Sequence, residues 1–334
     1  QVLAENLIKW GNPGVIVTNN DPADFTELGP LFDVILTDVP CSGEGMFRKD
    51  EVAMQEWSIE NVDTCWQRQR RILRDIWPCL KTGGLLIYST CTYNREENED
   101  NVAWIAQELG AEILPLETQP DWHITGNLTG TEFPVYRFLP HKTTGEGLFM
   151  AVLRKTADEP AVSVRTKTGG KASKKGKGGK VVALQVPKEM KAWVQGAGDY
   201  VFEVNDSEAM AFPAAYKDTY DLLKSQLRIL HAGISLGELK GKDWQPSHAL
   251  AMSTVFERDS FPMAELTYSQ AIAYLRKEAV VLSPEVPKGY VTFTYQGQVL
   301  GFAKNIGNRA NNLYPQEWRI RSGYLPEIIP DLFG

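Results

Sequence analysis

The first 155 residues alternate between two hydrophobic patterns. In some segments apolar residues recur every three or four positions, which is the spacing of an amphipathic helix, and short apolar runs separate these segments. The runs predict strands at residues 14–19, 32–38, 85–90, 111–116 and 148–155. Strands that alternate with helices are typical of βαβ units and of a largely parallel sheet. We therefore expect an α/β domain over residues 1–155.

Two helices of this domain have recognisable start signals. Ser58 can cap a helix whose apolar positions between residues 62 and 80 follow the three- and four-residue spacing. Asn94, with Glu97 three residues later, matches a capping box, and further acidic residues crowd the turn that follows, where the helix dipole favours negative charge. We expect the second helix to run to about Gly110, and we assign Asn94 and Glu97 to capping.

The rest of the chain divides by composition. Residues 156–180 are rich in Gly, Lys and Ser without hydrophobic periodicity, which indicates a basic flexible linker. Residues 181–262 mix strand patterns with a helical segment and predict an intermediate α+β domain. Residues 263–334 predict a small, mostly β domain, because two strand patterns there flank a turn at Gln296-Gly297.

Composition and charge narrow the class of protein. The chain is 43% hydrophobic and 23% charged, as in an ordinary soluble protein, and no apolar run approaches the roughly 18–20 residues of a membrane span. Residues 165–180 hold seven basic side chains and no acid, so the rest of the chain carries −14 against a net charge of −7 for the whole. Such a segment attracts a polyanion, usually nucleic acid, but a solvated linker without a ligand explains it equally well.

The four cysteines are too few for a secreted disulfide scaffold, and none forms a C-x-x-C pair. Reduced thiols and a cytoplasmic location are the default. None of the four histidines is spaced for zinc with these cysteines, so the sequence predicts no metal site. Cys65 and Cys79 lie on a predicted helix face and at its end, and we interpret them as core residues.

The other two cysteines lie just past predicted strands. Cys41 follows Asp38 by three residues, and Cys91 stands between two threonines directly after the strand at residues 85–90. Ligands of open α/β sheets bind beyond the carboxyl ends of the strands, so we expect the two cysteines to be neighbours in space. One cysteine at such a position is more often a small buried hydrophobe. Two at equivalent positions beside an acid indicate thiol chemistry.

The residues around these cysteines resemble a known family. The segments "DVPCSGEGMFRKD" and "YSTCTYNREENE" resemble two motifs of the RNA cytosine-5 methyltransferases of the Sun/Fmu family, and "TNNDPADF", "WQRQRRIL" and "FLPHKTTGEGLFMAVLRK" extend the resemblance to residue 155. The segment "YVTFTYQGQVLGFAKNIGNRANNLYPQEWRIR" is similar to the PUA-like tail of the bacterial RsmF type, which modifies small-subunit ribosomal RNA. The resemblance covers almost the whole chain and is weakest over residues 181–262. It implies a partial Rossmann-like, S-adenosylmethionine-dependent methyltransferase domain, followed by a small α+β domain and a PUA-like domain.

The resemblance also implies roles for individual residues. Cys91 would attack C6 of cytosine and form a covalent adduct, and Asp38 would bind the pyrimidine edge and contact the cofactor. Cys41 would assist loss of the C5 proton and release of Cys91. Asp21 matches the acid that contacts the adenine of S-adenosylmethionine, although Asn20-Asp21-Pro22 is also a good turn signal.

The resemblance implies RNA as the partner, ribosomal RNA first, and we expect basic residues to contact it. Arg48 and Lys49 follow the Cys41 loop and could hold a phosphate, although exposed basic residues are more often plain surface. In the PUA-like domain the expected RNA contacts are Lys304, Arg309, Arg319 and Arg321.

Two features of the family's cofactor site are missing from this sequence. Family members hold S-adenosylmethionine with a Pro-Gly-Gly-Lys loop and with an acid on the ribose, and neither occurs here. We therefore expect an incomplete cofactor site, the C-terminal part of a longer enzyme, and a sheet with one bare edge. Two alternatives stay open, namely a non-catalytic RNA-binding fragment and a transfer-RNA cytosine-5 methyltransferase.

Overall fold

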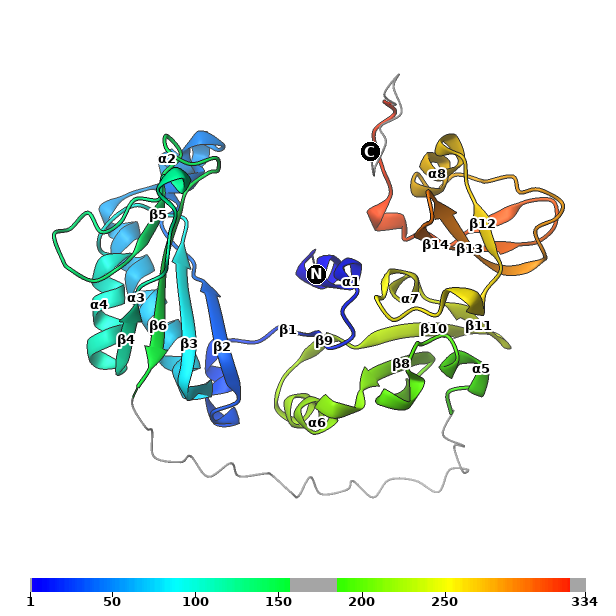
Figure 1. The fold of residues 1–334 in the computed structure, drawn as a ribbon, viewed down its shortest axis with the longest axis horizontal. Helices are drawn as coiled ribbons and strands as arrows, with labels where there is room; N and C mark the ends of the chain where they lie inside the picture. The colour runs from blue at the N-terminus through cyan, green and yellow to red at the C-terminus, as the bar shows by residue number, and fades with distance from the viewer. Residues whose placement is uncertain (1, 157–184, 325–334) are drawn as a thin grey trace. The chain divides into compact units, whose positions relative to one another are not determined.

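The computed structural model describes residues 2–156 and 185–324, and the basic segment at residues 165–180 lies outside them. The chain divides into two units, coloured along the chain in Figure 1. The N-terminal unit covers residues 20–173, and the C-terminal unit combines residues 1–19 with residues 174–334.

The N-terminal unit is built on a sheet in which the order of strands is β2-β3-β6-β4, with β5 paired to β6. β2 and β3 run parallel, whereas β6 is antiparallel to its neighbours. The strands are β2 Phe32–Asp38, β3 Leu80–Thr90, β4 Ala111–Leu114, β5 Tyr136–Phe138 and β6 Leu148–Lys155. The α/β architecture expected from the alternating pattern is confirmed.

Three α-helices accompany this sheet, α2 Glu51–Glu56, α3 Ile59–Ile76 and α4 Glu99–Glu108, with short 3-10 turns η1 Pro22–Leu28, η2 Glu44–Arg48, η3 Trp77–Cys79 and η4 Pro120–Trp122. Ser58 caps α3 as expected, accepting a hydrogen bond from Asn61 N. The start predicted for the next helix is wrong, because α4 begins only at Glu99. Asn94 and Glu97 do bond to each other, but they lie in a turn before the helix.

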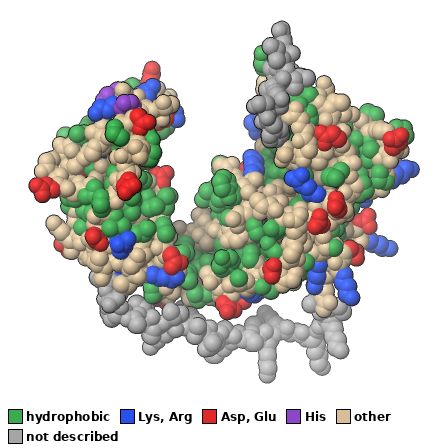
Figure 2. Space-filling view, in the orientation of Figure 1, with side chains coloured by type: hydrophobic (Ala, Val, Ile, Leu, Met, Phe, Trp, Pro, Cys, Tyr) green, Lys and Arg blue, Asp and Glu red, His purple; other side chains and the backbone are tan. Residues whose placement is uncertain are grey.

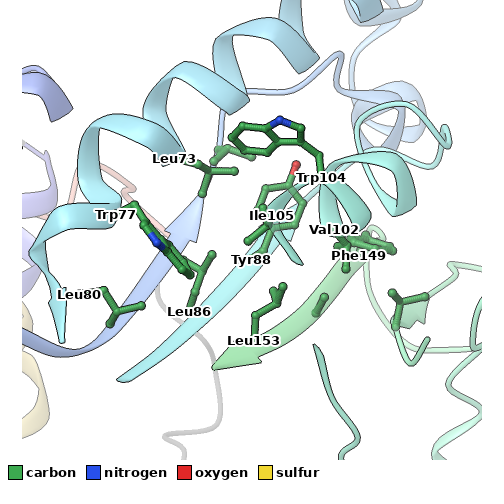
Figure 3. Packing of buried hydrophobic residues seen from close by; sticks show 13 residues of the cluster. Leu73, Trp77, Leu80, Leu86, Tyr88, Val102, Trp104, Ile105, Phe149 and Leu153 are labelled. Carbon is green, nitrogen blue, oxygen red and sulfur yellow. The ribbon is translucent and has the colours of Figure 1, made fainter. Parts of the chain in front are cut away.

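The core of the N-terminal unit lies between the sheet and helices α3 and α4. Figure 3 shows Leu73 of α3 and Trp104 and Ile105 of α4 facing Tyr88 and Leu86 of β3. Each fully buried side chain of this size stabilises the fold by about 1.5–3 kcal/mol relative to its exposed state. This core holds β3 rigidly, and with it the position from which Cys91 projects.

β2 forms one edge of this sheet, as expected. Among the described residues its backbone pairs only with β3, and Val34 and Leu36 are 50% and 68% exposed. A groove of about 330 Å³ runs beside the strand and is lined by Phe25, Ile72 and Ile76 among others. Figure 2 shows hydrophobic side chains gathered on the side of the unit along which β2 runs.

The C-terminal unit contains residues that the apolar pattern assigned to the first sheet. The unit begins with α1 Val2–Trp10, and the strand expected near residues 14–19 is β1 Ile16–Thr18, which pairs with β9 Ile229–Ala232. The compact units therefore group residues 1–19 with the C-terminal part of the chain. An apolar run specifies that a strand is favourable, but it does not specify the partner of its backbone hydrogen bonds.

Two four-stranded sheets make up most of the C-terminal unit, in the orders β11-β10-β8-β7 and β12-β13-β14-β15. Their strands are β7 Tyr200–Asn205, β8 Glu208–Pro213, β10 Ile234–Lys240, β11 Asp243–Pro246, β12 Met263–Glu265, β13 Gly289–Tyr295, β14 Gln298–Asn305 and β15 Ala310–Asn312. The helices are α5 Lys188–Lys191, α6 Lys217–Gln226, α7 His248–Met252 and α8 Tyr268–Leu275, with turns η5 Ala197–Asp199, η6 Ala214–Tyr216, η7 Arg258–Ser260 and η8 Gln316–Trp318.

The two sheets share part of one core. Phe302 of β14 packs against Phe256 and Phe261, with ring centroids 5.5 and 4.9 Å apart. The expected boundary between residues 262 and 263 therefore separates two sheets but is crossed by aromatic packing. The predicted turn between β13 and β14 is present, with Gln296 and Gly297 both at positive φ, as a type I′ hairpin turn requires.

A partly buried histidine lies in the same unit. The ring of His248 contacts the rings of Tyr314 and Trp318 edge-on, at centroid distances of 5.0 and 5.2 Å. Burial, followed by the charges of Lys277 and Lys9, lowers the pKa of His248 to about 4. This side chain is therefore neutral at physiological pH.

Candidate active site

The two cysteines that follow β2 and β3 meet at one edge of the sheet. Asp38, the last residue of β2, is in register with Ser89 of the parallel strand β3, so both chains leave the sheet at the same level. The Sγ atoms of Cys41 and Cys91 are 3.1 Å apart, and both residues are partly buried. The expectation that these cysteines are neighbours is confirmed, and Cys65 and Cys79 are buried in the core, as expected.

The hydrogen bond between the two thiols makes them chemically different. Donation by Cys41 is the largest influence on Cys91 and lowers its pKa to about 7, against burial and the negative charge of Asp38, which act to raise it. The same hydrogen bond, together with burial, raises the pKa of Cys41 far above its ordinary value. At pH 7 about half of Cys91 is therefore a thiolate that accepts a hydrogen bond from the Cys41 thiol, and a thiolate is the nucleophilic form of cysteine.

A buried carboxylate joins the two cysteine loops. Glu97 is 0% exposed and accepts hydrogen bonds from Ser42 N at 3.1 Å, from Gln69 Nε2 at 2.6 Å and from Asn94 Nδ2 at 2.8 Å. Its sequence position suggested a capping residue, but its carboxylate reaches the residue next to Cys41. The sequence contained a capping pattern without any sign of this longer contact.

An ion pair supports the Cys91 loop from another direction. Arg137 of β5 and Glu99 of α4 are 3% and 1% exposed and approach to 2.5 Å. Arg137 also donates to the backbone oxygen of Tyr93 at 2.9 Å. The charged pair thus ties β5 and α4 to the segment that follows Cys91.

The two remaining acidic candidates, Asp38 and Asp21, differ in their contacts. Asp38 is exposed at the end of β2, near enough for its charge to act on Cys91. Asp21 caps η1 by accepting from Ala23 N at 3.1 Å, and it pairs with Arg71 at 3.1 Å. The Arg71 hydrogen bond is the main reason that the pKa of Asp21 lies below its ordinary value. The turn role that the sequence allowed for Asp21 is therefore present.

The basic candidates near the Cys41 loop contact the segment around Gly145. Arg48 donates to Gly145 O at 3.4 Å, and Lys49 lies 3.4 Å from the carboxylate of Glu146, with about half of its side chain exposed. The hydroxyl of Tyr93 also donates to Glu146 O at 2.9 Å. This segment therefore lies against both cysteine loops.

The basic candidates of the C-terminal unit are less engaged. Lys304 lies 3.4 Å from Asp243 and 4.9 Å from the ring centroid of Tyr290. Arg309, Arg319 and Arg321 are exposed. Within residues 2–156 and 185–324, no group of three or more histidine, cysteine or acidic side chains could hold a metal ion, and no helix is long and apolar enough to cross a membrane.

Comparison with known proteins identifies the family. The family model described as 16S rRNA methyltransferase RsmB/F matches residues 1–154, and the model of the methyltransferase RsmF PUA domain matches residues 262–320. The ribosomal RNA small subunit methyltransferase F of Aliivibrio fischeri (strain MJ11) is 32% identical to this chain over 335 residues, and that of Escherichia coli O157:H7 is 32% identical over 340 residues. Both alignments cover 97% of this chain and 67% of the relative. That of Vibrio cholerae serotype O1 is 29% identical, covering 95% of this chain and 66% of the relative.

Solved structures include the NSun6 protein from Pyrococcus horikoshii with SFG. Its sequence is 30% identical to this chain. The match covers 42% of this chain and 34% of the solved one, with a TM-score of 0.36. The sequence relatives and the two domain matches carry the assignment. The chain spans about two thirds of the relatives' length, and it belongs to the ribosomal RNA small subunit methyltransferase F family of S-adenosylmethionine-dependent RNA methyltransferases, with a PUA domain at its C-terminal end.

Proposed function

We propose that this protein makes 5-methylcytosine in RNA, with small-subunit ribosomal RNA as the substrate, through a covalent bond between Cys91 Sγ and C6 of the base. The observation that carries the proposal is the thiol pair: Cys41 and Cys91 are 3.1 Å apart, and the pKa of Cys91 is lowered to about 7. A partly buried thiolate beside a thiol suits addition to an electron-poor ring carbon followed by controlled elimination.

The first step belongs to Cys91 and Asp38. The Cys91 thiolate adds to C6, the C5–C6 double bond opens, and the electron pair makes C5 nucleophilic. The carboxyl group of Asp38, at the exposed end of β2, binds the N3 and N4 edge of the base, where charge changes during the addition. S-adenosylmethionine, when bound, would supply the methyl group that C5 accepts.

The second step belongs to Cys41. The hydrogen bond to Cys91 is the largest cause of the raised pKa of Cys41. Once Cys91 has become a thioether it carries no negative charge, so that cause disappears and Cys41 becomes more acidic. Cys41 then gives its own proton to water and, as a thiolate, accepts the C5 proton, while the C5–C6 double bond re-forms and the bond to Cys91 breaks with its electron pair returning to sulfur. Addition thus prepares Cys41 for its part in release.

The described residues fit the cytosine side of the site better than the methyl-donor side. Asp38 and Asp21 are the proposed cofactor contacts, but the carboxylate of Asp21 already serves η1 and Arg71. No strand within residues 2–156 and 185–324 pairs with the outer edge of β2, and Leu36 is 68% exposed. We therefore propose that the cofactor site is incomplete within these residues.

We also propose that the domain division is the one the composition of the chain indicates. It consists of a methyltransferase domain at residues 1–155, a linker at 156–180, an intermediate domain at 181–262 and a PUA-like domain at 263–334.

The proposed RNA contacts are basic side chains in both units, and the proposed place of action is the cytoplasm. Near the active site they are Arg48 and Lys49, and in the PUA domain they are Lys304, Arg309, Arg319 and Arg321. Phosphate contacts of this kind position the RNA without reading its sequence. The target base has to leave its helix to reach the cysteines.

An exchange assay tests the chemistry without a methyl donor. Reversible addition of Cys91 to C6 lets C5 exchange its hydrogen with water, so the chain should release tritium from small-subunit ribosomal RNA labelled at cytosine C5. Cys91→Ala should abolish the release. In a protein whose methyl-donor site is complete, Cys41→Ala with S-adenosylmethionine present should accumulate a covalent RNA adduct visible on a denaturing gel. Tritium release by Cys91→Ala at the wild-type rate would refute the assignment of the nucleophile.

A second candidate follows from the exposed edge of β2. If the methyl-donor side is absent, these residues act as an RNA-binding fragment without transfer activity. Calorimetric titration with S-adenosylmethionine tests whether these residues can transfer a methyl group by themselves: micromolar binding would contradict the incomplete cofactor site and support the enzyme, and no binding up to millimolar concentration would support the fragment. Comparing transfer RNA with ribosomal RNA in the exchange assay distinguishes the two substrate classes.

A further inference from the structure

Two carboxylates cross between the cysteine loops in opposite directions. Glu97 follows Cys91 in sequence, yet its carboxylate accepts a hydrogen bond from Ser42 N, beside Cys41. Glu44 follows Cys41 in sequence, yet it accepts hydrogen bonds from Tyr93 N at 2.6 Å and from Asn94 N at 2.9 Å. Each loop is therefore held by a carboxylate that belongs to the other loop.

These contacts act where the sheet no longer can. β2 ends at Asp38 and β3 at Thr90, so the backbone around both cysteines lies beyond the regular strand pairing. Hydrogen bonds from backbone amides to a carboxylate are charge-assisted and roughly twice as strong as neutral ones. They replace the missing sheet contacts with links of defined geometry.

The close approach of the two loops leaves little freedom. Gly45 N donates to Cys91 O at 2.8 Å, and a Cβ atom at position 45 would lie 2.5 Å from that same oxygen. The Oγ atoms of Ser42 and Thr92 are 2.9 Å apart. A small shift of either loop would therefore change the distance between the two thiols.

We propose that Glu44 and Glu97 are positioning residues that hold Cys41 and Cys91 at hydrogen-bonding distance. The inference rests on the proposed function, because the distance between the thiols matters only if they act together on a base. Neither carboxylate touches the reacting atoms directly. Both act by setting the separation of the two sulfur atoms.

The charge of Glu97 and its proposed positioning role change the pKa of Cys91 in opposite directions, which makes the proposal testable. Its negative charge alone raises the pKa of Cys91, whereas the hydrogen bond from Cys41 that it helps to maintain lowers that pKa. If Glu97 acted only through its charge, Glu97→Gln would lower the pKa of Cys91. If it positions the loop, the pKa must rise, since the amide of glutamine cannot accept from all three donors.

The test is the pH dependence of Cys91 alkylation by iodoacetamide, followed by mass spectrometry of the peptide that contains Cys91. In wild type the midpoint should lie near 7, and in Glu97→Gln and Glu44→Gln it should move toward the ordinary value of 9.0. Glu96→Gln is the matched control: it removes an exposed charge next to Glu97, and its midpoint should stay at the wild-type value. Thermal unfolding of each variant shows whether it is folded.

The alkylation midpoints of Glu97→Gln and Glu44→Gln decide whether the two carboxylates position the thiols. A midpoint that stays near 7 or falls in both folded variants would overturn the positioning role. Glu44 is only partly buried, so Glu44→Gln decides the question if Glu97→Gln does not fold. This assay uses no RNA, so it is independent of the exchange assay. Wild type with a midpoint near 7 and no tritium release would refute the proposed function and leave the positioning intact.

Discussion

Replacing Cys41 with alanine should make Cys91 less reactive than in wild type at neutral pH and more reactive than in wild type at alkaline pH. The substitution removes the hydrogen bond that is the largest cause of the lowered pKa of Cys91, while burial and the charge of Asp38 remain and act in the opposite direction. The pKa of Cys91 should therefore rise from about 7 toward 9.0. A change of that size corresponds to roughly 3 kcal/mol of lost preference for the thiolate.

The rates follow from this change. At pH 7 about half of Cys91 is thiolate in wild type, against about 1% in the variant, so the reactive fraction falls roughly 50-fold. The nucleophilicity of a thiolate rises with its pKa with a Brønsted coefficient of about 0.4–0.5, so the thiolate of the variant is roughly eightfold more reactive. Alkylation of Cys91 at pH 7 should therefore be about sixfold slower in the variant.

Above about pH 8 the order should reverse, because wild type is then almost fully thiolate and the variant holds the more reactive, more basic thiolate. The assay is the rate of iodoacetamide labelling of the Cys91 peptide between pH 5.5 and 10.5. Cys65→Ala serves as the control, because this buried thiol lies on α3. Labelling curves of Cys41→Ala and wild type that do not cross would show that Cys41 is not the donor.

Three further predictions concern stability and RNA. Glu99→Gln should cost about 3–5 kcal/mol of unfolding free energy in urea, because it leaves the buried charge of Arg137 without its partner; a loss under 1 kcal/mol would contradict this. His248 has a folded-state pKa of about 4, below its ordinary 6.5, so the unfolded state binds the proton first and stability should fall as pH drops from 6.5 to 4; His248→Phe should flatten this part of the pH profile. Exchanging Arg309 and Arg319 for alanine should reduce the salt dependence of RNA binding by about 0.7–0.9 in slope for each RNA phosphate that is no longer neutralised, and an unchanged slope would remove both from the interface.

The local pattern of the chain anticipated much of the N-terminal unit. β2 matches the predicted run residue for residue, and Ser58 caps α3, because strand alternation and helix capping depend on neighbours in sequence. The meeting of Cys41 and Cys91 was predictable for the same reason. Parallel strands end at one edge of a sheet, so residues that directly follow them converge.

Long-range contacts decided the rest. The apolar run at β1 favours a strand, but its pairing with β9 depends on which backbone edges are free. The packing of Phe302 across the predicted domain boundary likewise depends on how two sheets come together. The Asn94 and Glu97 pattern indicated a cap and could not show that the carboxylate of Glu97 would bond to Ser42.

The sequence by itself indicated the residues that we propose to carry the chemistry: two cysteines and an acid at the ends of adjacent strands, in motifs typical of one family. Only the tertiary structure decided how the two cysteines differ. The pKa of each thiol depends on a hydrogen bond of 3.1 Å between residues 50 positions apart and on the burial around them. Distances of this kind are set by the packing of both loops together, because two carboxylates from opposite sides hold the backbone in place.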